Sequence, residues 1–158
     1  MKTRIFPFIA ALIVLGLSGC FRDSGEAVGV DVTTTPAFKA FLTNYVAAVN
    51  SKDRAKLNGC IHAKSVAMLA ENQKFSDEWF GGRFGYSIPA EYTVEAAEIP
   101  ADKPLPLANG GVVWPVKPTY QVQINFKPNP TDLATMVLWV ASENDKWYEV
   151  LPSAAKKN

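Results

Sequence analysis

Residues 35–50, TPAFKAFLTNYVAAVN, indicate the fold more clearly than any other stretch of the chain. The Thr35 side chain can accept from the free N–H groups of a first helical turn, and Pro36 has no N–H to leave unpaired there. Apolar residues then recur at the spacing of one helix face: Phe38, Phe41, Leu42, Tyr45, Val46 and Val49. The pattern predicts an amphipathic helix that ends at about Asn50 and buries that face.

Two shorter helices are expected directly after it. Residues 51–53, SKD, restart a helical turn, which Asn58-Gly59 ends because both residues tolerate the left-handed conformation found past helix ends. A third helix covers about residues 61–72. Its inner face is expected to contain Ile61, Ser65, Val66, Leu69 and Ala70.

The stretch 75–86, FSDEWFGGRFGY, is ambiguous. Ser76 can cap a short helix, which Gly81-Gly82 would stop. The glycines resemble a phosphate-binding loop only superficially, because they follow no predicted strand and open no clear helix. We therefore expect a short helix followed by an aromatic loop, without nucleotide binding.

From Pro89 onward the periodicity is that of strands. Residues 91–99 alternate loosely, and residues 120–126, YQVQINF, alternate strictly between apolar and polar side chains. Residues 133–141, LATMVLWVA, predict a strand buried on both faces, and residues 147–151 a short last strand. Residues 112–116 contain a proline, which favours an edge or bulge position.

Helices first and strands afterwards predict a segregated α+β domain, in which the N-terminal helices pack on a curved, mainly antiparallel sheet. The chain has 158 residues, 48% of them apolar and 20% charged, as expected for one globular domain. We assign that domain to residues 35–152 and a polar tail to residues 153–158. The net charge of +1 argues against a general nucleic-acid-binding protein.

The first residues predict export. Lys2 and Arg4 precede an apolar run, residues 5–17, that is too short to cross a bilayer as a helix, so residues 1–19 are interpreted as a signal peptide. Leu17-Ser18-Gly19-Cys20 resembles the lipobox of bacterial lipoproteins. That resemblance implies that Cys20 becomes the lipidated first residue of the mature chain and anchors it to a membrane.

The residues after Cys20 predict where the protein resides. Phe21 in place of Asp, by resemblance to lipoproteins of bacteria with two membranes, implies transport to the outer membrane. Residues 20–34 are polar and contain two glycines, so they are interpreted as a tether with a span of roughly 20 Å. The domain is expected to face the periplasm close to the membrane surface.

Two motifs carry a family resemblance. The segments Asn50-Ser51-Lys52-Asp53 and Asp145-Lys146-Trp147-Tyr148-Glu149-Val150, with the order and spacing of the elements between them, resemble the nuclear-transport-factor-two-like superfamily. The resemblance covers roughly residues 35–151 and implies a cone-shaped, cystatin-like α+β fold with a pocket inside the cone. Some members place acids, tyrosines or histidines in that pocket for catalysis, but their catalytic pattern has no residue-by-residue match in this chain.

Few residues are candidates for chemistry. Cys60 lies two residues before His62, the only histidine, but side chains at that spacing on a helix face different directions, and no third group orients the ring. Glu91 and Glu95 would share one strand face and Glu98 the other, as solvated edge residues. We therefore predict no catalytic residues, no metal site and no cofactor.

An interaction surface is the remaining candidate. Aromatic and arginine side chains tend to anchor interfaces, and the expected loops contain Trp79, Phe80, Arg83, Phe84 and Trp114. The alternative is that this segment only covers the open end of the cone. The leading hypothesis is a lipid-anchored, non-enzymatic binding module of the envelope, of which an immunity or inhibitor protein is one version. The alternatives are a small-molecule carrier and, third, an enzyme acting in the cone.

Overall fold

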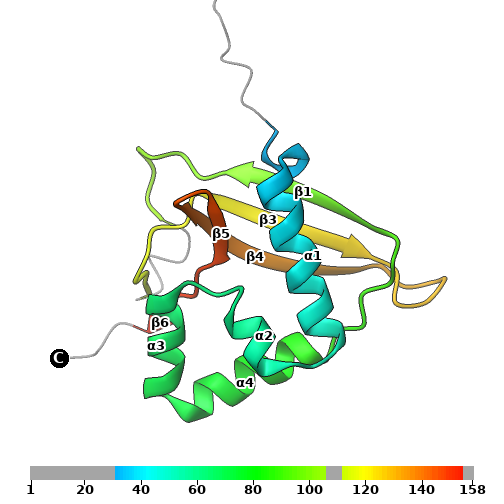
Figure 1. Ribbon diagram of the computed structural model, residues 1–158, viewed down its shortest axis with the longest axis horizontal. Coiled ribbons are helices and arrows are strands. Elements are labelled where there is room, and N and C mark those ends of the chain that lie inside the picture. The colour runs from blue at the N-terminus through cyan, green and yellow to red at the C-terminus, as the bar shows by residue number, and fades with distance from the viewer. Residues whose placement is uncertain (1–30, 106–111, 155–158) are drawn as a thin grey trace, which may run out of the picture.

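The computed structural model describes residues 31–105 and 112–154. The predicted signal peptide, the lipobox with Cys20 and most of the tether lie outside the described residues. Helices come first along the chain and strands follow, which confirms the predicted α+β class. In Figure 1, α1 lies across the sheet, and α2, α3 and α4 gather together along one side of it. The helical elements are η1 (Val32–Thr34), α1 (Pro36–Asn50), α2 (Arg54–Asn58), α3 (Ala63–Glu71) and α4 (Gln73–Phe84).

Polar side chains begin the first three α-helices, as the local chemistry requires. The Phe38 N–H donates to Thr35 Oγ1 at 3.4 Å, which confirms the predicted cap of α1. The Lys56 N–H donates to Asp53 at the start of α2, and the Lys64 N–H donates to His62 Nδ1 at the start of α3. The third helix therefore begins at Ala63, later than expected.

The predicted end of the fourth helix is wrong. Asn72, rather than Ser76, caps α4 by accepting from the Phe75 N–H at 3.1 Å, and the helix continues through Gly81 and Gly82 to Phe84. A glycine inside a helix costs only about 1 kcal/mol relative to alanine. Side chains on either side of the two glycines pack into the core and outweigh that cost, among them Phe80, which is 2% exposed.

Four strands form the main sheet in the order β1-β3-β4-β5, with every neighbouring pair antiparallel. The sheet is not strongly curled, so the cone that the family resemblance implies is not part of the observed architecture. The strands of this sheet are β1 (Tyr92–Glu98), β3 (Tyr120–Phe126), β4 (Ala134–Glu143) and β5 (Lys146–Glu149).

One face of the sheet forms the core with the apolar stripe of α1. In β3 the alternate residues Val122, Ile124 and Phe126 are buried, and their register partners in β4 continue the same face. All six stripe residues of α1 are buried too, as predicted. The core faces of β3 and β4 consist of Val122, Ile124, Phe126, Met136, Leu138 and Val140.

The expectation that β4 is buried on both faces is wrong. Leu133 lies before the strand and is 71% exposed, and Thr135 is also exposed. Only alternate residues of β4 meet the helices, because the helices cover one face of the sheet. A separate two-stranded ladder pairs β2 (Val112–Val113) with β6 (Ser153–Ala154), so the predicted polar tail starts inside a ladder.

Candidate functional site

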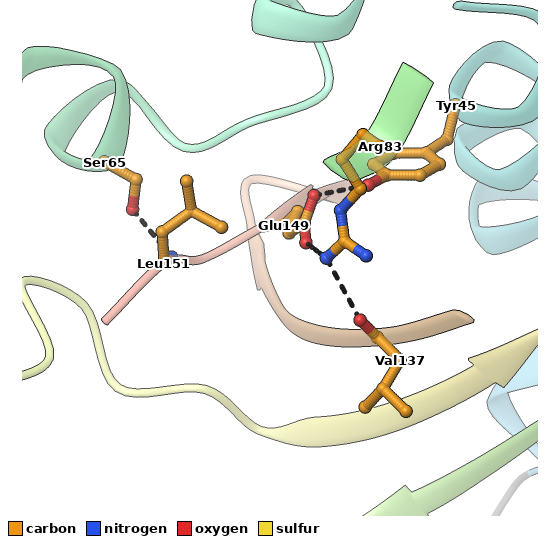
Figure 2. Close-up of polar contacts among 6 residues, drawn as sticks. All are labelled: Tyr45, Ser65, Arg83, Val137, Glu149 and Leu151. Atoms are coloured by element: carbon orange, nitrogen blue, oxygen red, sulfur yellow. Dashed lines mark hydrogen bonds and ion pairs between the residues drawn. The ribbon is translucent and has the colours of Figure 1, made fainter. Parts of the chain in front are cut away.

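Three buried polar side chains meet between α1, α4 and β5 (Figure 2). The Tyr45 hydroxyl donates to Glu149 Oε2 at 2.7 Å, and Arg83 Nη2 donates to Glu149 Oε1 and to the carbonyl oxygen of Val137, the latter at 3.0 Å. Glu149 and Tyr45 are 0% exposed, and the Arg83 side chain retains 15%. The carboxylate thus accepts from both neighbours inside the core.

The fold explains why a glutamate lies there. Glu149 is the register partner of Val140, so it shares the inward face of the sheet with the apolar core residues. Tyr45 belongs to the buried stripe of α1, and Arg83 lies near the end of α4, one residue after the two glycines. The cluster therefore connects two helices, α1 and α4, to the strand β5.

Burial and charge act in opposite directions on these groups. Burial raises the pKa of Glu149, although Arg83 and the Tyr45 hydroxyl favour its ionised form. Burial also raises the pKa of Tyr45, and the neighbouring Glu149 carboxylate adds to that rise. For Arg83 burial opposes the charge, but the adjacent carboxylate more than compensates, so its pKa is raised. The contact between Arg83 and Glu149 has the geometry of an ion pair, and the raised pKa of Tyr45 keeps its phenol neutral.

Cys60 and His62 are both buried, and their side chains have different neighbours. Cys60 is 7% exposed and borders a shallow groove with Phe41 and Trp147, and burial raises the pKa of its thiol. His62 accepts from Lys64 with Nδ1, so its Nε2 carries the proton and lies 3.3 Å from Glu143 Oε2. This geometry gives no imidazole to activate the thiol.

Four of the five residues of the predicted contact surface lie together on α4, and the fifth, Trp114, lies elsewhere. Phe80 is 2% exposed and stacks edge-on against Trp79, and Arg83 is engaged by Glu149. Trp79 and Phe84 are half-buried against the core. Trp114 instead contacts Trp139, whose side chain points to the opposite face of the sheet, with ring centroids 5.7 Å apart.

The three glutamates of the predicted strand are all exposed. Glu95 and Glu98 belong to β1 and Glu91 immediately precedes it. No ion pair among the described residues involves any of them. By contrast, Asp77 accepts from Arg54 at 2.8 Å. Exposed carboxylates therefore precede β1 and lie along it, and none of them forms an ion pair within the part of the chain that the structure describes.

The two edges of the sheet differ in how they are covered. At the β5 edge, the His62 N–H donates to the Glu149 oxygen and the Glu149 N–H donates to the Cys60 oxygen, both at 2.9 Å. At the β1 edge no backbone group of the described residues hydrogen-bonds to the strand from outside, although the short helix η1 lies close to β1. Sequence periodicity could not identify this edge, because the position of an edge depends on the order of the strands in the sheet.

The ladder between β1 and β3 shows which groups face outward. The Ile99 N–H donates to the Thr119 oxygen, so every second residue before Ile99 also directs its N–H and C=O groups to β3. The residues between these direct their N–H and C=O groups away from β3, to the outer edge of the sheet. These are Tyr92, Val94, Ala96 and Glu98.

An open groove of about 820 Å³ adjoins the beginning of this edge. Its walls include Tyr92, Phe126 and the exposed side chain of Leu133. Glu91 and Lys127 also line it, so the groove contains one charge of each sign. Its apolar walls lie next to unpaired backbone groups.

Comparisons with known proteins identify no relative. No protein-family model matches the chain, and neither a curated protein nor a solved structure is similar to it. Within the described residues, no helix has the length and apolar character that crossing a membrane requires. The same residues contain no group of three or more potential metal ligands among histidine, cysteine, aspartate and glutamate.

Proposed function

We propose that this protein is a lipid-anchored lipoprotein of the bacterial envelope that works by binding another protein rather than by catalysis. The open edge of β1 is the observation that supports this most strongly. A seven-residue strand offers unpaired donors and acceptors at the surface, and exposed strand edges pair readily with other chains. The opposite edge is covered by the chain itself.

The buried polar groups support the same proposal. Tyr45, Arg83 and Glu149 hydrogen-bond to one another inside the core, as in a packing cluster, and Arg83 Nε is the atom of the three side chains that is buried without a partner. The thiol of Cys60 is held in its unreactive form by burial. The lipobox at residues 17–20 supplies the anchor, and the following tether would hold the domain near the membrane.

Site-specific photo-crosslinking in the living envelope tests this function. A photoreactive residue replaces Thr93, an exposed residue of β1, and in a matched control it replaces Lys74, an exposed residue of α4. A discrete protein adduct at residue 93 that is missing at residue 74 is expected in the membrane fraction. Cys20→Ser should move the protein out of that fraction. Equal adducts at both positions, or none at residue 93, would contradict the proposal.

A further inference from the structure

Backbone pairing defines the shape of a partner for the β1 edge. An incoming chain must be extended to reach the outward groups of Tyr92, Val94, Ala96 and Glu98 together. Its side chains would then alternate between the two faces of the sheet. On the inner face they would lie beside Tyr92, Val94 and Ala96, which are half-buried against the core. Apolar side chains fit at those positions.

The charges on the outer face of β1 indicate which side chains the partner would place there. On the outer face the incoming side chains would lie beside Glu95, which is exposed, has the uncharged Gln123 as its register partner and forms no ion pair among the described residues. Opposite charges directly across two strands stabilise the pair, whereas like charges destabilise it. Lysine or arginine side chains fit at these positions.

We infer that the β1 edge accepts, as an added strand, an extended segment of another protein in which apolar and basic residues alternate. This inference rests on the proposed function and specifies the chemistry of its partner. A second copy of this chain is a poorer occupant, because pairing two β1 strands would bring Glu95 and its neighbours in one copy against those of the other.

Peptide binding tests the inference directly. The chain from residue 20 onward, with Cys20→Ser, is titrated into fluorescent peptides of the length of β1, one alternating lysine with valine and a control alternating glutamate with valine. The lysine peptide is expected to bind and the glutamate peptide to bind at least about fivefold more weakly. Glu95→Lys should weaken the lysine peptide about five- to tenfold, and Glu95→Gln less.

A second variant separates strand addition from charge attraction. Val94→Pro removes an outward N–H without touching the ladder to β3, and should abolish binding. If that variant does not fold, a lysine peptide N-methylated at alternate residues gives the same test on the unchanged protein. Binding that survives both changes, or equal binding of the two unmodified peptides, would overturn the inference.

Two further results would also overturn it. A dimer in analytical ultracentrifugation that becomes monomeric with Val94→Pro would make a second copy the occupant of the edge. A discrete crosslink at residue 93 without binding of the lysine peptide would leave the proposed function standing and refute the partner chemistry. Loss of the crosslink as well would refute both.

Discussion

Replacing Arg83 with methionine tests whether the buried polar cluster stabilises the fold. Methionine keeps much of the aliphatic volume but removes the guanidinium, which donates to Glu149 and to the Val137 oxygen. The Glu149 carboxylate would keep one donor, the Tyr45 hydroxyl, while remaining 0% exposed. Breaking a buried ion pair on one side costs about 3–5 kcal/mol, and we expect Arg83→Met to lower the free energy of unfolding by that amount near neutral pH.

The pH dependence identifies the cause of the loss. Burial raises the pKa of Glu149 and Arg83 counteracts that rise, so removing Arg83 raises the pKa further. A carboxyl group with a raised pKa in the folded state contributes its full stability below the unfolded pKa and loses it as the pH increases through the folded pKa. The deficit of Arg83→Met should therefore shrink as the pH falls from neutral toward the ordinary pKa of glutamate.

Urea unfolding followed by tryptophan fluorescence measures both effects. Adding Glu149→Gln to Arg83→Met should recover part of the loss at neutral pH and remove its pH dependence, since no buried charge remains. Lys74→Met is the matched control, because Lys74 and Glu78 form an exposed pair at 3.9 Å, and its effect should stay within about 0.5 kcal/mol. An unfolding midpoint of Arg83→Met equal to wild type, or a deficit independent of pH, would show that the Arg83–Glu149 pair does not stabilise the fold.

Three other substitutions or treatments test particular parts of the structure. Leu42→Ala should cost about 2–5 kcal/mol in urea unfolding and Leu133→Ala less than about 0.5, because the first is 5% exposed and the second 71%; equal effects would show that the helix stripe is not core. Glu95→Pro should lower the melting temperature more than Val94→Pro, because only Glu95 directs its N–H to β3. The reverse order would mean that Val94, and not Glu95, donates to β3. The Cys60 thiol should react slowly with iodoacetamide at neutral pH until urea is added, because burial raises its pKa; rapid labelling of the folded protein would contradict this.

Local patterns predicted the elements that depend on one face of a helix or strand. The stripe of α1 with its Thr35 cap and the strict alternation of β3 need only neighbouring residues, and both are confirmed. The continuation of α4 through Gly81-Gly82 was missed, because the side chains that hold this helix contact distant parts of the chain. Likewise, the mostly apolar sequence of β4 predicted burial on both faces, although the helices cover only one of them.

The candidate site depends on contacts that no local pattern contains. Glu149 has the same strand parity as Trp147, so alternation alone could place it on the inner face, yet a lone glutamate in a strand is usually expected at the surface. Its burial requires Arg83, which lies 66 residues earlier in the chain. The open edge of β1 follows from strand order, and so does the covering of β5 by residues 60–62.

Residue-resolved amide hydrogen exchange across β1 tests the central claim, that this edge is open in the protein alone and paired in the complex. In the free chain from residue 20 onward we expect alternation, with fast exchange at Tyr92, Val94 and Ala96 and protection at the residues between them. Addition of the lysine–valine peptide should protect the fast set as well. Uniform protection of the strand before any peptide is added would contradict the claim, as would an unchanged fast set afterwards.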